Sequence, residues 1–346
     1  MNELLGVFGS GPTATFLIEL LIIIVKIAVI IAITMLHVAY ATYFERKVIG
    51  HMQVRLGPMR VGPHGLLQPI ADGVKLFFKE DIIPAQADRP VFQIAPFVAI
   101  FATLSSLAVI PFFDLFYLAN INIGLLYLLA MSGLAAYSLI MSGWGSNSKY
   151  SFLGGLRSTA QVISYEIALA FSLVSVMIMA GSMNLIEIVM AQQEYWYGMY
   201  LVPQIVAYIV FLIAMLAETN RTPFDLPEAE SELVAGYFTE YSGMRFALFF
   251  LGEYVGMIVM SSIAVVCFWG GWTLPPIVVK LIPPLAAVPG IIWFILKVYI
   301  HIFFFYWIRA TVPRYRYDKL MALGWKILIP VALANVIATA LVKFIF

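Results

Sequence analysis

The chain has 346 residues, of which 62% are hydrophobic and 11% are charged, whereas soluble domains carry about a quarter charged residues. This composition excludes an ordinary soluble domain and predicts an all-α, polytopic membrane protein that forms a single transmembrane domain over residues 1–346. No basic block is large enough for nucleic acid, and the single cysteine, Cys267, excludes an internal disulfide or a cysteine-ligated iron–sulfur cluster within the chain.

About eight transmembrane helices are predicted, because eight apolar segments approach the ~20 residues that a helix needs to cross the hydrocarbon core. They lie at roughly 18–44, 90–113, 123–144, 158–182, 199–217, 245–269, 285–308 and 326–345. The start of the chain has no basic region and no clear cleavage site, so we expect the first segment to remain as a signal anchor.

The basic residues are distributed unequally between the loops. Sixteen of the twenty Lys and Arg residues fall within 46–89, 149–157, 221–245 and 309–326, which are alternate connections between the predicted helices. Because positively charged loops stay on the cytoplasmic side, this face is predicted to be cytoplasmic, or to face the matrix in an organelle. Both termini are then predicted on the opposite side.

The first of these loops, at 45–89, contains an amphipathic segment. Leu67, Ile70, Val74 and Phe77 recur at helical spacing, and polar residues occupy the other face. This pattern is typical of a helix that lies in the membrane interface, and equally of a surface helix that packs against its neighbours.

A second predicted cytoplasmic loop, at 218–245, gathers six of the nineteen acidic residues in the stretch "AETNRTPFDLPEAESELVAGYFTE". They are Glu218, Asp225, Glu228, Glu230, Glu232 and Glu240. Pro223 and Pro227 restrict the backbone on both sides, so a loop of fixed shape is expected. Glu228 and Glu232 would share one face of a helix, where their like charges repel.

Five ionisable residues fall inside the predicted spans: Lys26, Glu166, Glu218, Glu253 and Lys297. A charge at mid-membrane costs about 2.5–3.5 kcal/mol on insertion scales, so such residues usually face a bundle interior or a wet cavity. One interpretation is a buried Glu–Lys pair that only holds helices together. The other is a set of carboxylates whose desolvation and mutual repulsion let them bind and release protons near neutral pH.

Signatures of other chemistry are weak or absent in the sequence. It contains no phosphate-binding glycine motif, no serine elbow and no metalloprotease motif. His37 and His301 lie in spans at similar depth, as a bis-His haem would need, but one isolated pair is weak support. We therefore predict no catalytic residue, no metal site and no cofactor bound by this chain itself.

Five stretches are long and specific enough to indicate a family. They read "ERKVIGHMQVRLGP", "RVGPHGLLQPIADGVKLFFKE", "RSTAQVISYE", "AETNRTPFDLPEAESELVAGYFTEY" and "WIRATVPRYRYDKLM". From about Tyr43 to Lys326 the chain resembles the family of the H subunit of proton-pumping NADH–quinone oxidoreductase, respiratory complex I, whose mitochondrial equivalent is NADH dehydrogenase subunit 1. Met59 departs from that family, which commonly has Asn there, and no function is drawn from it.

The resemblance implies a membrane subunit that forms much of a quinone chamber and couples quinone reduction to proton translocation through buried carboxylates. The quinone-chamber residues that it implies are Arg46, Arg55, Asp72, Arg221, Phe224 and Asp225. The proton-coupling residues that it implies are Glu166, Glu218, Glu228, Glu230, Glu232, Glu240 and Glu253. Arg309, Arg314 and Arg316 are expected among the loops near the junction with the peripheral arm.

The same resemblance implies the surroundings of the chain. It is expected to be a non-redox subunit that is not catalytic alone, with quinone as substrate and with FMN and iron–sulfur clusters in partner subunits. The expected partners are peripheral-arm subunits at the cytoplasmic face, small membrane subunits, antiporter-like subunits and lipid. The expected location is the inner membrane of a bacterium, with both termini on the periplasmic side.

Two alternatives share parts of this pattern. A membrane subunit of an energy-converting hydrogenase or formate hydrogenlyase would carry similar acids but would use no quinone. A stand-alone ion transporter would transport ions when purified alone. The stretches "ETNRTPFDLPEAESELV" and "GPHGLLQP" favour the quinone enzyme over the hydrogenase, and transport by the purified subunit alone is not expected.

Overall fold

The computed structural model describes residues 12–114, 116–225 and 235–345. Helices are the regular elements of these residues, which contain no β-strand, so the all-α prediction is confirmed. The α-helices are α2 (Pro12–Met52), α3 (Gln68–Phe78), α4 (Arg89–Ser106), α5 (Gly124–Gly145), α6 (Lys149–Ala180), α7 (Leu185–Gln193), α8 (Ile205–Glu218), α10 (Gly243–Phe268), α11 (Pro276–Leu281), α12 (Gly290–Thr311), α13 (Tyr317–Leu323) and α14 (Ile329–Ile345). Short 3-10 helices are η1 (Pro63–Gly65), η2 (Gly236–Phe238) and η3 (Pro283–Ala287), and a π-helical stretch (Gly324–Leu328) joins α13 to α14.

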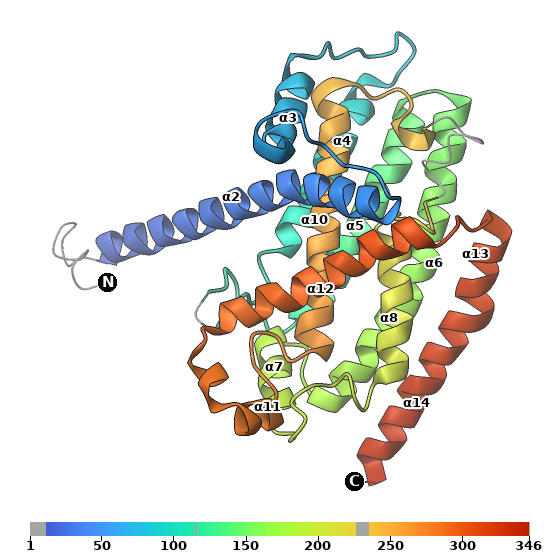
Figure 1. Cartoon of the computed structure of the whole chain (residues 1–346). Helices are drawn as coiled ribbons and strands as arrows, with labels where there is room; N and C mark the ends of the chain where they lie inside the picture. The colour runs from blue at the N-terminus through green and yellow to red at the C-terminus, as the bar shows by residue number, and fades with distance from the viewer. Residues whose placement is uncertain (1–11, 115, 226–234, 346) are drawn as a thin grey trace.

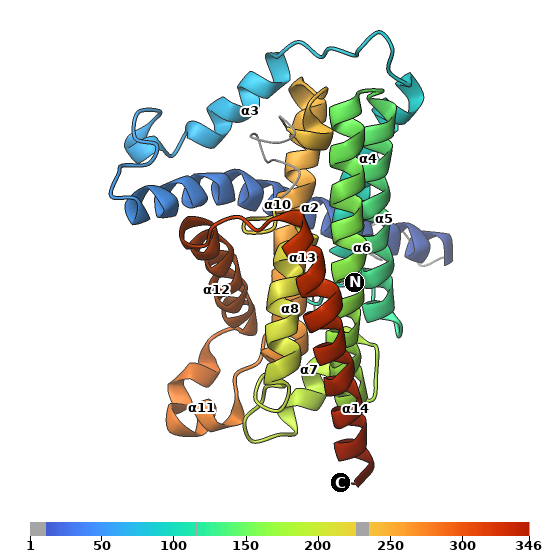
Figure 2. The ribbon, with the colours of Figure 1, turned by 90° about the vertical axis from the view of Figure 1, so that its right-hand side faces the viewer.

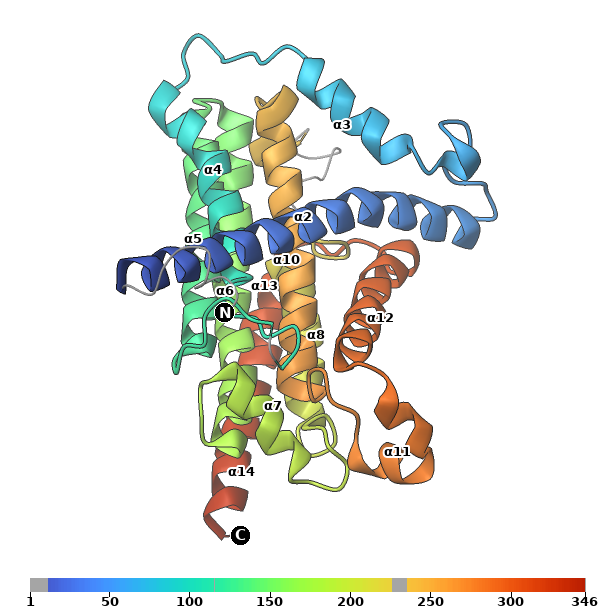
Figure 3. The ribbon, with the colours of Figure 1, turned by 90° about the vertical axis from the view of Figure 1, so that its left-hand side faces the viewer.

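Most of the long helices run side by side in one bundle, and α2 crosses them at a large angle (Figure 1 and Figure 3). α3 and the starts of α4 and α6 lie at one end of the bundle, whereas α7, α11 and the C-terminus lie at the other (Figure 1 and Figure 2). Among the described residues, six helices are long and apolar enough to cross a membrane: Phe16–Met52, Gly124–Gly145, Lys149–Ala180, Gly243–Phe268, Gly290–Thr311 and Tyr317–Ile345. The chain is therefore a polytopic membrane protein, as its composition predicts.

Each of the eight predicted segments coincides with a helix, but several boundaries differ from the prediction. α8 begins at Ile205 rather than near 199, because Pro203 lacks the N–H that a helix interior needs. α12 begins at Gly290 rather than near 285, directly after Pro289. α6 begins at Lys149 rather than near 158, so residues 149–157 are helix rather than loop.

The helix α8 is too short to cross a bilayer by itself. Its 14 residues span about 21 Å at about 1.5 Å per residue, against a hydrocarbon core of about 30 Å. After Glu218 the chain continues as a buried, non-helical segment, 219–225. Irregular backbone at such depth is stable only where protein groups satisfy it. The Gln161 amide does so, because it donates to the carbonyl oxygens of Ala217 at 2.8 Å and Phe224 at 2.9 Å.

Glycines allow the helices around this buried segment to approach closely. A Cβ added to Gly155 of α6 would lie 2.8 Å from the carbonyl oxygen of Leu139 on α5. A Cβ added to Gly154 would lie 2.6 Å from the Cα of Gly236 in η2. Because small residues permit close backbone packing in membrane proteins, α5, α6 and η2 converge here without bulky side chains between them.

The amphipathic helix α3 keeps its apolar face exposed. Ile70, Val74 and Phe77 are 57%, 50% and 73% exposed, and Leu67 just before the helix is 46% exposed. This face is thus not packed against the described helices of the chain. The exposure favours a helix in the membrane interface over a packed surface helix.

The buried Lys297 on α12 does not pair with a carboxylate of the described residues. Its ammonium donates to the carbonyl oxygens of Trp269 at 2.6 Å, Gly271 at 3.0 Å and Thr273 at 2.7 Å. These carbonyls follow the C-terminus of α10, where a cation is favourable. The interpretation that Lys297 forms a buried Glu–Lys pair is therefore wrong for the described residues.

Replacing Lys297 with Met is expected to destabilise the protein by about 3 kcal/mol or more, because each buried carbonyl left without a donor costs about 1–3 kcal/mol. The midpoint of thermal unfolding in detergent measures the loss. Lys343→Met is the matched control, since the exposed Lys343 donates to a single carbonyl, that of Met179. An unchanged midpoint in K297M would show that the three carbonyl contacts contribute little.

Candidate functional site

A cavity of about 590 Å³ lies between the C-terminal part of α2, the loop that follows it, α10 and α12. We call it the polar cavity, because Glu45, Arg46, Arg55, Tyr254 and Arg309 line it. Its other lining residues are Thr42, Ile49, Gln53, Leu56, Gly57, Pro58 and Phe250. The volume suits a small organic molecule, and the guanidinium groups favour a ligand with oxygen acceptors.

Glu45 is the buried charge on the wall of the polar cavity, with 4% of the residue exposed. Its carboxylate accepts a hydrogen bond from the Tyr254 hydroxyl at 2.6 Å and a short, charge-assisted one from the Arg309 guanidinium. A buried carboxylate needs such partners to be stable. The contacts at Glu45 therefore join α2, α10 and α12 at the cavity.

Arg221, in the segment that follows α8, lies between two carboxylates. One guanidinium nitrogen is 3.6 Å from the Glu45 carboxylate, and another is 3.8 Å from the Glu253 carboxylate. The guanidinium also lies over the Tyr254 ring, 4.2 Å from its centroid. Because Arg221 is buried and shared, a change of charge at one carboxylate changes the electrostatic energy of the other.

Phe224 and Asp225, two other predicted chamber residues, lie in the same segment as Arg221 but contact different residues. The Phe224 ring packs 5.7 Å from Tyr165 and 5.6 Å from Tyr315, between ring centroids. The buried Asp225 carboxylate lies 3.3 Å from the Arg314 guanidinium. The structure therefore does not bring Phe224 and Asp225 to the wall of the polar cavity.

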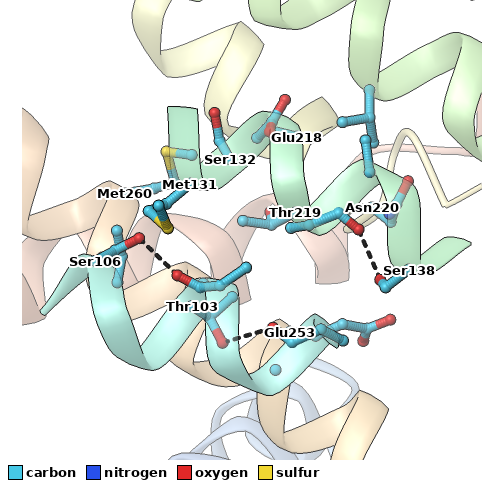
Figure 4. Close-up of a pocket in the computed structure, with 18 of the residues that line it drawn as sticks. Thr103, Ser106, Met131, Ser132, Ser138, Glu218, Thr219, Asn220, Glu253 and Met260 are labelled. Carbon is cyan, nitrogen blue, oxygen red and sulfur yellow. Dashed lines mark hydrogen bonds between the residues drawn. The ribbon is translucent and has the colours of Figure 1, made fainter. Parts of the chain in front are cut away.

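A second, smaller cavity of about 100 Å³ lies between α4, α5, α8 and α10. We call it the acidic cavity, because Glu218 and Glu253 line it from opposite sides, with Thr219 and Asn220 between them (Figure 4). The hydroxyls of Thr103, Ser106, Ser132 and Ser138 also belong to its wall (Figure 4). The Tyr237 hydroxyl donates to Glu253 at 3.2 Å. Most of the other lining residues are apolar, so the two carboxylates face a small and poorly solvated space.

The Glu218 carboxylate is incompletely satisfied by the described residues. Its Oε2 is buried and has no hydrogen-bond partner among them. Glu166 of α6 is close enough to interact with it electrostatically, and accepts a hydrogen bond from Ser132 at 3.1 Å. Two carboxylates that share a poorly solvated place repel each other unless one binds a proton. The two carboxylates are therefore candidate proton-binding groups.

The remaining predicted site residues line the polar cavity, lie beside it, line neither cavity, or lie outside the described part of the chain. Arg46 forms an ion pair with Asp72 of α3 at 2.8 Å, and Arg55 donates to the Gln53 side chain at 2.8 Å. Glu240 is half-buried in the turn before α10 and lines neither cavity. Glu228, Glu230 and Glu232 lie outside the described residues.

Sequence reasoning missed Glu45 and its partner Tyr254. Glu45 stands beside Arg46 and Lys47, so the sequence groups it with a solvated loop. The available signal was the apolar sequence that continues past it, because α2 extends to Met52 and places residue 45 inside a helix.

The two histidines considered for haem do not form a haem site. Both ring nitrogens of His301 are occupied, by the Tyr208 hydroxyl at 2.9 Å and by the Lys297 carbonyl at 2.8 Å. His37 instead bonds to the Tyr299 hydroxyl at 3.0 Å. Within the described part of the chain no group of three or more His, Cys, Asp and Glu residues could hold a metal ion.

These features define the class of the protein: a polytopic helical membrane protein in which one buried arginine connects a polar, ligand-sized cavity with an internal group of carboxylates. Comparison with known proteins identifies the family. Residues 25–340 match the family model described as NADH dehydrogenase, and the chain belongs to this family.

Relatives in this family are similar over nearly the whole chain. The H subunit of NADH-quinone oxidoreductase from Rhodospirillum rubrum is 56% identical over 321 residues, which are 92% of this chain and 93% of that protein. The corresponding H subunit from Paramagnetospirillum magneticum is 52% identical over 337 residues, 97% of this chain and 96% of that protein. The H subunit from Brevibacillus brevis is 52% identical over 343 residues, 99% of this chain and 97% of that protein.

Proposed function

We propose that the chain is the membrane subunit of an NADH–quinone oxidoreductase complex, in which it forms much of the quinone chamber and couples quinone reduction to proton translocation. The names of the relatives and their coverage support membership of such a complex. The chain acts as a non-redox subunit, and partner subunits with FMN and iron–sulfur clusters deliver the electrons. Its partners are those peripheral-arm subunits and the small and antiporter-like membrane subunits.

The polar cavity is the part of this chain proposed to receive the quinone head group. A quinone ring carries two carbonyl acceptors, and the cavity wall offers guanidinium donors from Arg46, Arg55 and Arg309. The exposed apolar residues of α2 and α3 provide a surface for the isoprenoid tail. The ion pair between Asp72 and Arg46 holds α3 beside the polar cavity.

The observation that carries the coupling proposal is the position of Arg221 between Glu45 and Glu253. Reduction of one quinone consumes two electrons and two protons and yields the quinol. When electrons arrive, negative charge develops in the polar cavity and draws the guanidinium groups of its wall towards it. As Arg309 is drawn away from Glu45, Arg221 moves closer to Glu45 and stabilises the Glu253 carboxylate less, so Glu253 binds a proton. Once the quinol has formed, the negative charge is gone, and Arg221 returns to its position between Glu45 and Glu253.

Protons bound at Glu253 are proposed to exchange within the acidic cavity. Glu218 on the opposite wall is the next carboxylate (Figure 4). Glu166, which accepts a hydrogen bond from Ser132, follows it. The acids of 228–240 are proposed to belong to the same path. The grouping of basic residues supports a bacterial inner-membrane orientation in which the loops 45–89 and 218–245 are cytoplasmic and both termini are periplasmic.

Glu253→Gln is expected to reduce proton translocation by roughly tenfold or more, the loss typical of removing a proton-transfer group, while quinone reduction declines less. Glutamine keeps the shape of the side chain and can still accept from Tyr237, but it cannot bind the proton. NADH-driven quinone reduction and dye-detected acidification are measured together in membrane vesicles. Glu187→Gln, at an exposed acid of α7, is the control. A normal proton-to-electron ratio in E253Q would refute the proposed role of Glu253.

A further inference from the structure

Two adjoining cavities between α2 and α12 share no lining residue with the polar cavity. Their volumes are about 150 and 180 Å³, and His37 and Tyr299 line both of them. We refer to the pair as the aromatic cavity. It is reached from the lipid-facing side of α2, where its lining residue Ile33 is 60% exposed.

Aromatic rings make up much of the wall of this cavity. Phe112, Phe116 and Phe294 line one part, and Phe44 and Phe303 line the other. Phe112 and Phe294 meet edge to face, with their centroids 5.8 Å apart. Aromatic rings stack on a flat ring more favourably than on a flexible saturated chain, because only the flat ring offers a π face.

One polar pair stands among these rings. The Tyr299 hydroxyl and the His37 Nδ1 are 3.0 Å apart, and their rings lie 5.1 Å apart. The Nε2 of His37 is buried and has no hydrogen-bond partner among the described residues. When the tyrosine donates to Nδ1, the imidazole proton lies on Nε2. A buried donor without an acceptor is costly, so a ligand carbonyl at this point would be stabilising.

We propose that the aromatic cavity is a second binding position for an isoprenoid quinone, in which one ring carbonyl accepts a hydrogen bond from His37. The inference rests on the proposed function, which makes a quinone the substrate. Phospholipid is the less suitable occupant, because the residues that line the cavity include no Lys or Arg to pair with a phosphate. The tail then lies along the exposed apolar surface of α2.

The test uses the assembled complex in lipid nanodiscs and a photoreactive quinone with a short isoprenoid tail. Illumination is expected to label peptides of α2 and α12 that contain His37 and Tyr299, and excess unlabelled quinone is expected to suppress this labelling. Tyr299→Phe, which removes one oxygen, is expected to reduce it about fivefold, the effect of one neutral hydrogen bond. His37→Phe is expected to reduce it by at least as much.

Tyr208→Phe is the matched control, because it removes the same kind of hydroxyl–imidazole contact, to His301, outside the aromatic cavity. Labelling of α2 and α12 should be unchanged in this variant. Labelling that excess quinone does not displace, or that Y299F leaves unchanged, would overturn the second position. The proposed function would survive that result if labelling at the polar cavity and quinone reduction stayed intact, so the two failures are distinguishable.

Discussion

Arg221→Met is expected to lower NADH-driven quinone reduction by roughly 100-fold or more while the complex still assembles. Loss of the shared cation removes the electrostatic link between the two carboxylates, and a 100-fold slower rate corresponds to about 2.7 kcal/mol of activation free energy. In this variant Glu45 keeps Arg309 and Tyr254, and Glu253 keeps Tyr237, so neither carboxylate loses all its partners. What is lost is the single cation between them. Quinone reductase activity and the amount of assembled complex on native gels are the measurements.

Two further variants separate this role from general charge loss. Arg221→Lys keeps the positive charge but cannot present two separate nitrogens to two carboxylates, so we expect quinone reduction to recover in part and proton translocation to recover less. Lys280→Met removes an exposed cation of α11, at the other end of the bundle, and should leave both activities unchanged. If R221M translocated protons with a normal ratio per electron, Arg221 would not be the coupling residue.

The helices were predictable because the membrane leaves an apolar segment of this length few alternatives to a helix. Their ends were less predictable, because local features decide them. Proline stops α8 and α12 from starting earlier, whereas the first turns of α6 are helical where their glycines pack closely against α5 and η2. The short α8 shows the difference best: the hydropathy of 199–217 predicts a span, but the helix itself occupies only 205–218.

The carboxylates of the acidic cavity were visible in the sequence because each interrupts an apolar segment. Glu166, Glu218 and Glu253 stand out in this way, and the structure brings Glu218 and Glu253 to one cavity with Glu166 beside it. Glu45 could not be recognised from the sequence, because the neighbouring Arg46 and Lys47 make it look like part of a solvated loop. The placement of Phe224 away from the polar cavity was also unpredictable. It depends on where α8 ends and on the hydrogen bond from Gln161 to the Phe224 carbonyl, which positions the non-helical segment.

Glu45→Gln is expected to be the most damaging change at the polar cavity, with an effect of about 3–5 kcal/mol on stability, because it leaves Arg309 and Arg221 beside a neutral group in a buried place. The midpoint temperature of thermal unfolding of the complex and the rate of quinone reduction are both expected to fall. Arg309→Met alone should cost less than E45Q, because its side chain is 34% exposed and Glu45 retains Arg221 and Tyr254.

The double variant E45Q/R309M tests whether the charge balance at Glu45, rather than its shape, is responsible. Its effect on unfolding is expected to be smaller than the sum of the two single effects by about 1–3 kcal/mol, since removing Arg309 also removes the unpaired cation that E45Q creates. The restored stability should not restore quinone reduction, because Arg221 still lacks its carboxylate on the side of the polar cavity. Additive losses of stability would show that the Glu45–Arg309 contact contributes no interaction energy, and the electrostatic link between the two cavities would then depend on Arg221 alone.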